Sequence, residues 1–154
     1  MGAKLNRHNS NQAYQTPPEF LTAVYRKFGI NGFQLDAAAD ANNSIAPTHY
    51  DEQSNGLLQP WYNITWCNPP FANIAPWVEK AWIESEQGVT SFLLVPASVG
   101  ANWWKNWVHD KAYVMFLNGR ITFGGQTDPY PKDCALLIYR TATSGGYNVW
   151  SWMQ

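Results

Sequence analysis

The chain has 154 residues, of which 45% are hydrophobic and 14% charged, so it is expected to form one compact domain and not to be largely disordered. Its formal net charge of −1 excludes a globally basic protein that coats nucleic acid, and any phosphate contact must come from a local patch. Nine Trp, eight Tyr and seven Phe are unusually many, and most of these rings are expected in the core.

The first third of the chain contains an arm, a helix and a strand. Residues 1–13 are polar and Asn-rich and predict a flexible arm, which leaves 14–154 as the folded domain. Residues 16–28 predict a helix, since Thr16 can cap it, prolines can occupy its first turn and apolar residues recur at helical spacing. The segment "FQLD", residues 33–36, predicts a short buried strand that ends in an acid.

The remaining elements alternate between strands and helices. Residues 41–62 are polar and turn-rich and give only a weak indication of a strand or helical turn. The continuous apolar run at 89–98 is typical of a strand that is buried on both faces. The other predicted elements are strands at 64–67, 112–117 and 134–140 and helices at 73–88 and 102–110.

This alternation predicts an α/β fold with a mainly parallel sheet flanked by helices. Ligands bind such sheets outside the carboxyl ends of the strands. Asp36, Asn68 and the "PAS" turn at 96–98 each follow a predicted strand directly, so all three are expected along one edge of the sheet.

The segment "NITWCNPPF", residues 63–71, suggests the chemistry of that edge. Two prolines end the strand abruptly and hold Asn68 at the mouth of a stiff turn. The Asn68 carboxamide and the Pro69 carbonyl can together grip both hydrogens of a planar –NH₂ group, and Phe71 can stack on the attached ring. The alternative is an ordinary turn in which Phe71 belongs to the core.

Five motifs in order carry a resemblance to a known family. They are "YQTPPEF", "FQLDAAADANNSIAPTHYDEQSNGLLQPW", "TWCNPPF" with "WVEKAW", "FLLVPAS…NWW" and "FLNGRITF". From about Tyr14 to Tyr139 the chain resembles the phage-type DNA N6-adenine methyltransferase family. The resemblance implies a Rossmann-like sheet, S-adenosyl-L-methionine as cofactor, DNA as partner, and direct methyl transfer to the N6 amine of an adenine that is flipped out or single-stranded.

The same resemblance implies roles for individual residues. The catalytic motif would be Asn68, Pro69, Pro70 and Phe71. Thr16 and Pro17 would line the methionine part of the cofactor, and Asp36 would accept a hydrogen bond from its ammonium group. Where many methyltransferases have a glycine-rich turn, this chain has Ala37 and Ala38. Either Asp51 or Glu52 would bind the ribose hydroxyls.

Three residues are candidates for DNA contacts. Arg120 can grip a phosphate or can pair with a local carboxylate. Lys105 and Trp104 lie in a predicted helix that is also rich in tryptophan, where core packing is the alternative for Trp104. Since 154 residues leave no room for an added recognition domain, a short or relaxed sequence preference is expected.

Several further features bound the function. The cysteines, Cys67 and Cys134, share no close spacing with each other or with a histidine, which argues against a metal site, and Cys67 is expected to be a small buried residue. No secretory leader and no membrane-spanning segment are apparent, so a cytoplasmic location is expected.

Two alternatives stay open at this point. The same motif can methylate another planar amine, either cytosine N4 or a protein glutamine, and the glutamine reaction would need a peptide groove in place of phosphate contacts. A non-catalytic binding module of the same fold is the other alternative, and calorimetry that shows no cofactor binding would favour it.

Overall fold

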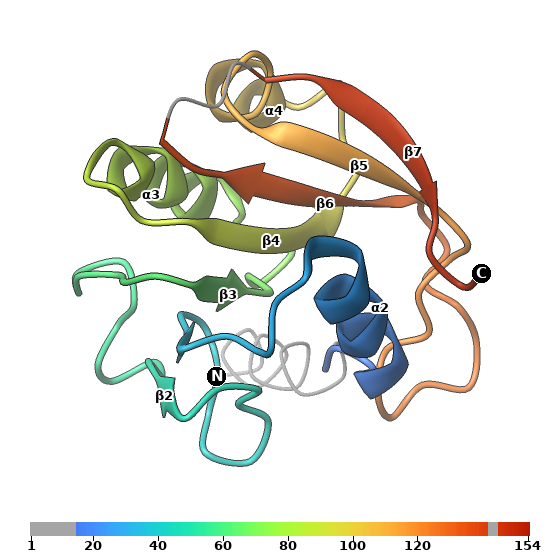
Figure 1. The fold of residues 1–154 in the computed structure, drawn as a ribbon, viewed down its shortest axis with the longest axis horizontal. Coiled ribbons are helices and arrows are strands. Elements are labelled where there is room, and N and C mark those ends of the chain that lie inside the picture. The colour runs from blue at the N-terminus through green and yellow to red at the C-terminus, as the bar shows by residue number, and fades with distance from the viewer. Residues whose placement is uncertain (1–14, 142–144) are drawn as a thin grey trace.

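Seven strands form one sheet in the computed structural model, which describes residues 15–141 and 145–154 (Figure 1). The predicted N-terminal arm, residues 1–13, lies outside the described residues. The order of the strands across the sheet is β2-β1-β3-β4-β6-β5-β7. Their bounds are β1 Leu35–Asp36, β2 Thr48–His49, β3 Thr65–Cys67, β4 Ser91–Pro96, β5 Tyr113–Asn118, β6 Cys134–Tyr139 and β7 Tyr147–Ser151.

The strand directions confirm the predicted α/β fold with a mainly parallel sheet. β1 pairs in parallel with β2 and with β3, β3 pairs in parallel with β4, and β5 pairs in parallel with β7. The exception is β6, which lies between β4 and β5 and is antiparallel to both. The carboxyl ends of the parallel strands therefore meet at one edge of the sheet.

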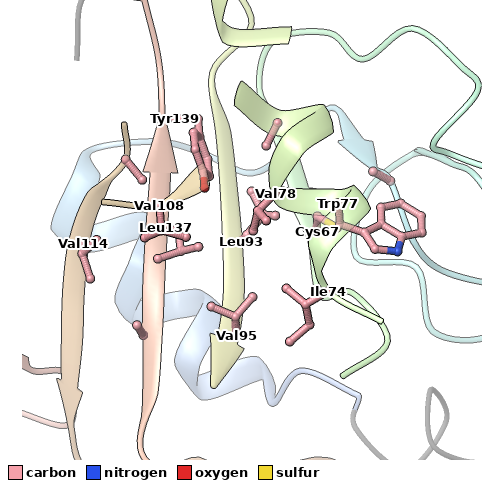
Figure 2. Packing of buried hydrophobic residues seen from close by; sticks show 14 of the residues in the cluster. Cys67, Ile74, Trp77, Val78, Leu93, Val95, Val108, Val114, Leu137 and Tyr139 are labelled. Atoms are coloured by element: carbon pink, nitrogen blue, oxygen red, sulfur yellow. The ribbon is translucent and has the colours of Figure 1, made fainter. Parts of the chain in front are cut away.

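Helices cover both faces of this sheet, and alternate residues of β4 show how. Leu93 and Val95 point into the core beneath α3 (Ala75–Glu86) and α4 (Asn102–Trp107). Phe92 and Leu94 point into the core beneath α2 (Pro18–Phe28). Figure 2 shows the first of these cores, in which side chains of α3 and the turn before it face Leu93 and Val95. Burial on both faces explains why β4 reads as an uninterrupted apolar run.

The helix α2 begins one residue later than its sequence predicts. Pro17, in place of the expected Thr16, is the N-cap residue, and no side-chain hydrogen bond caps the helix. The Thr16 hydroxyl instead contacts Asn68, as described below. The helix ends at Gly29, whose φ of 66° is the left-handed conformation that closes a helix.

The sequence did not predict β7. This strand lies at the outer edge of the sheet and is exposed along most of its length, so it lacks the apolar run by which the inner strands are recognised. The segment 41–62 likewise contains only the two-residue strand β2, and turns make up the rest of it.

Candidate active site

The edge formed by the carboxyl ends of β1, β3 and β4 brings together the residues that the sequence placed there. Asp36 ends β1 and Asn68 follows β3, and both line one small cavity. β4 runs parallel to β3, so the turn at 97–98 lies at the same edge. The predicted edge is confirmed, although this turn is not among the residues that line the cavity.

The Asn-Pro-Pro-Phe segment forms a tight turn at this edge. The Pro70 carbonyl accepts a hydrogen bond from the Asn73 amide at 3.0 Å, which closes the turn. The Asn68 carboxamide nitrogen lies 3.2 Å from the Thr16 hydroxyl oxygen, so residues 52 positions apart meet here. The turn and this contact together fix the place of the Asn68 side chain.

Phe71 belongs to a small aromatic cluster. Its ring is half-buried and meets Tyr130 edge-on at 5.3 Å and Phe123 at 5.8 Å. Both partners come from the β5–β6 loop, residues 119–133, in which sequence reasoning had singled out only Arg120. One face of the Asn-Pro-Pro-Phe segment is thus bounded by aromatic rings on a different segment of the chain.

Asp36 is a buried acid at the end of β1, only 3% exposed. Its carboxylate accepts hydrogen bonds from the Ile45 amide at 3.1 Å and from the Ala38 amide at 3.4 Å. Burial raises the pKa of Asp36 from 3.8 to about 7, against the lowering effect of these two amides. A cation that binds here would restore the charged form of this carboxylate.

A larger cavity of about 590 Å³ adjoins the Asp36 site, and Ala38 and Asn43 line both. This volume is within the range of pockets for small organic ligands and cofactors. The lining residues come from the turn after β1, from the β2–β3 segment, from the turn between β3 and α3 and from the start of α3. They are Ala38, Ala39, Asp40, Asn43, Tyr50, Asp51, Glu52, Gln53, Asn55, Gly56, Pro70, Ala72, Asn73 and Trp77.

Both candidates for the ribose acid, Asp51 and Glu52, line the larger cavity. Asp51 uses one carboxylate oxygen to accept bonds from the Ser54 amide at 2.9 Å and the Ser54 hydroxyl at 3.0 Å. These hydrogen bonds lower the pKa of Asp51 and tie it to its own turn. Of the two acids, Asp51 thus already uses its carboxylate within its own turn.

The other cofactor-binding predictions have different surroundings. Thr16 is buried and lines the small cavity. Ala38 lines both cavities, whereas Ala37 is fully buried and Pro17 is the N-cap residue of α2; neither of these two lines the small or the larger cavity.

Sequence reasoning missed several lining residues. Asn43 lines both cavities, and its side-chain oxygen accepts a bond from the Asp40 amide at 2.8 Å. Tyr50, Gly56 and Trp77 line the larger one. The Asn-Gly pair at 55–56 was the available signal, because this dipeptide marks tight turns.

The three proposed DNA contacts lie in different environments. Trp104 is 3% exposed and stacks on Phe116 at 6.0 Å, so its ring packs in the core in this structure. Lys105, its neighbour on α4, is exposed. Arg120 lies 3.4 Å from the Asp133 carboxylate, and both side chains are more than half exposed. Exposed pairs of this kind are weak, so the Arg120 guanidinium can exchange to another anion.

Within the described part of the chain, no helix is long and apolar enough to cross a membrane. No three His, Cys, Asp or Glu side chains there are grouped to hold a metal ion. Cys67 is fully buried, which confirms its expected packing role, and burial raises the pKa of its thiol.

The sheet is mainly parallel, has helices on both faces, and carries an acid at the end of its first strand next to a cavity, which is the arrangement of a Rossmann-like methyltransferase fold. Comparison with known proteins gives the family. Residues 4–144 match the model of the DNA N-6-adenine-methyltransferase (Dam) family, so the chain belongs to this family of adenine-specific DNA methyltransferases.

Two phage relatives are similar to the chain, and both are named DNA N-6-adenine-methyltransferase. The protein of Escherichia phage T1 is 25% identical over 111 residues, which cover 71% of this chain and 46% of that protein. The protein of Haemophilus phage HP1 (strain HP1c1) is 24% identical over 147 residues, 90% of this chain and 85% of that protein. The chain thus spans about half the length of the T1 relative and most of the HP1 relative.

Proposed function

We propose that the chain transfers a methyl group from S-adenosyl-L-methionine to the N6 amine of adenine in DNA. The observation that carries this proposal is the meeting of Asn68, Thr16 and Asp36 around one cavity, next to a second cavity large enough for a nucleoside. Incubation of the purified chain with cofactor and unmethylated DNA, followed by mass spectrometry of the nucleosides, tests it. Detection of N6-methyladenine supports the proposal. Detection of N4-methylcytosine would instead make cytosine the target base, and the absence of any modified nucleoside would contradict DNA as the substrate.

The described residues fit the cofactor. Its ammonium group would bind at Asp36, a buried carboxylate whose charge is restored by a cation. Thr16 and Ala38 would lie beside the methionine part, and the adenosine would occupy the larger cavity between Tyr50 and Trp77. When bound, S-adenosyl-L-methionine supplies a methyl group on a positively charged sulfur.

The chain's own residues would hold the target amine. The Asn68 carboxamide oxygen and the Pro69 carbonyl would accept hydrogen bonds from its two N–H groups and localise the nitrogen lone pair for attack. Phe71, supported edge-on by Tyr130 and Phe123, would stack on the base and fix its angle. Such positioning and electrostatic stabilisation need no strong base.

The affinity for the cofactor is expected to depend on pH in a bell shape. In the cofactor-free protein Asp36 has a pKa of about 7, so below this pH binding of an ammonium group must release a proton. Affinity should then rise up to tenfold per pH unit until about pH 7, and fall above about pH 8, where an α-amino group loses its proton. Calorimetry in buffers of different ionisation enthalpy measures both the affinity and the released proton. In an Asp36→Asn variant, the rise of affinity with pH below about 7 should disappear. If the affinity of the wild type does not change between pH 5.5 and 7, Asp36 does not bind the ammonium group.

For the ribose we propose Glu52, because Asp51 already uses one oxygen for its turn with Ser54. A ribose diol is best held by both oxygens of one carboxylate. Glu52→Gln is expected to weaken binding of S-adenosylhomocysteine about tenfold to a hundredfold, the worth of a charge-assisted hydrogen bond. Asp51→Asn, the matched control, should change it much less. The reverse order in calorimetry would make Asp51 the ribose ligand.

DNA phosphates would be met by Arg120 and Lys105, both exposed. We keep the sequence-based prediction of a short or relaxed target preference. Sequencing of the methylated positions in random DNA checks this prediction, and methylation confined to one site of four or more base pairs contradicts it.

A further inference from the structure

Residues 15–17, which precede α2, meet the β5–β6 loop through a backbone hydrogen bond. We call residues 15–17 the strap. Gln15 and Gly124 form an isolated antiparallel bridge, in which the Gly124 amide donates to the Gln15 carbonyl at 2.8 Å. A Cβ at position 124 would lie 3.3 Å from the Gln15 Cβ and 3.4 Å from its Oε1. The two segments approach so closely that a side chain at 124 would crowd the strap.

On its other side, the strap contacts the catalytic motif. Thr16 is buried, and its hydroxyl oxygen lies 3.2 Å from the Asn68 carboxamide nitrogen. Gln15 and Thr16 line the same small cavity as Asp36 and Asn68. The strap therefore borders the place where the cofactor's methionine part would bind.

The β5–β6 loop reaches the other half of the site. Phe123, the neighbour of Gly124, is buried and packs against Phe71 and Tyr130, both at 5.8 Å. Tyr130 is tied back into the loop by its amide, which donates to the Ile121 carbonyl at 2.7 Å. This loop therefore borders the ring that would stack on the target base.

We propose that Gln15 and Gly124 are positioning residues that join the cofactor side and the base side of the site into one unit. This inference rests on the proposed function. It assigns a positioning role to a glutamine and a glycine, residue types that do not by themselves indicate such a role. The bridge is the backbone contact that connects the strap with the loop carrying Phe123 and Tyr130. Because misplacement of reacting groups by about 1 Å can cost about a hundredfold in rate, a shift of a few tenths of an ångström should be measurable.

The test uses a crowding variant and its rescue. Gly124→Ala adds one methyl group against the Gln15 side chain, and Gln15→Gly removes both Cβ and Oε1 from its path. The matched control is Gly100→Ala, an exposed site where a Cβ meets nothing within 4 Å. Methylation kinetics with S-adenosyl-L-methionine and an unmethylated oligonucleotide are measured for all variants, together with the melting temperature of each.

We expect Gly124→Ala to lower kcat about tenfold and to raise the KM for both cofactor and DNA. The double variant Gln15→Gly/Gly124→Ala should regain most of the rate, while Gly100→Ala should match the wild type. The inference is overturned if Gly124→Ala has wild-type kinetics or changes the KM for one substrate alone. It is also overturned if Gln15→Gly does not restore the rate that Gly124→Ala has lost. A wild-type chain that methylates no DNA instead overturns the proposed function, which separates the two failures.

Discussion

Asn68→Ala is expected to lower kcat for adenine methylation by at least about a hundredfold, the usual cost of losing one preorganised hydrogen-bonding group at a reacting centre. The variant removes the carboxamide that would accept a hydrogen of the target amine. It leaves the other groups proposed for the cofactor in place, because Asp36 and most of the residues that line the larger cavity belong to other segments. Binding of S-adenosylhomocysteine, measured by calorimetry, should therefore change less than tenfold.

Asn68→Asp is the matched control for this experiment. A carboxylate has the same shape as the carboxamide and keeps an acceptor oxygen, and the Thr16 hydroxyl can donate to it at the distance observed here, 3.2 Å. This variant should retain clearly more activity than Asn68→Ala. If both variants methylate DNA at the wild-type rate, Asn68 does not grip the amine, and the Asn-Pro-Pro-Phe segment is a structural turn.

The parts of the site that lie directly after strands could be predicted from the sequence. Asp36 ends one short buried strand and Asn68 follows another, and the rule that parallel strands end at one edge places them together. The two prolines after Asn68 mark the end of β3 without any reference to the rest of the chain. Local chemistry and one topological rule were therefore enough for this half of the site.

The parts that depend on contacts between distant segments could not be predicted. Phe123 and Tyr130 reach Phe71 because the β5–β6 loop folds back to the edge of the sheet, and no periodicity in that loop indicates this. Trp104 is similar: nothing in "NWWKNW" says which of its rings turns inward, and the structure buries Trp104. β6 also enters the sheet between β4 and β5, an order that its apolar pattern alone does not determine.

Gly56 shows a constraint of the same kind with a large expected effect. This glycine is buried in the wall of the larger cavity, and a Cβ there would lie 2.1 Å from the Ala37 carbonyl oxygen and 3.2 Å from the Trp77 ring. The closest atom belongs to the backbone at the end of β1, so a rotamer change cannot relieve the clash. The turn that follows β1, which lines both cavities through Ala38, would have to move.

Gly56→Ala is therefore expected to weaken binding of S-adenosylhomocysteine at least about tenfold and to destabilise the fold by roughly 1–3 kcal/mol, the usual cost of overpacking. For a chain of this size, 1 kcal/mol corresponds to a fall in melting temperature of about 2–4 °C. Calorimetry and thermal unfolding measure the two effects, and Gly100→Ala, which places the same methyl group in open space, is the control. If Gly56→Ala binds the cofactor analogue as tightly as the wild type does, the larger cavity is not where the adenosine lies. Loss of binding with the melting temperature only slightly lowered would instead place the effect in the cavity wall, since a global loss of structure would move both together.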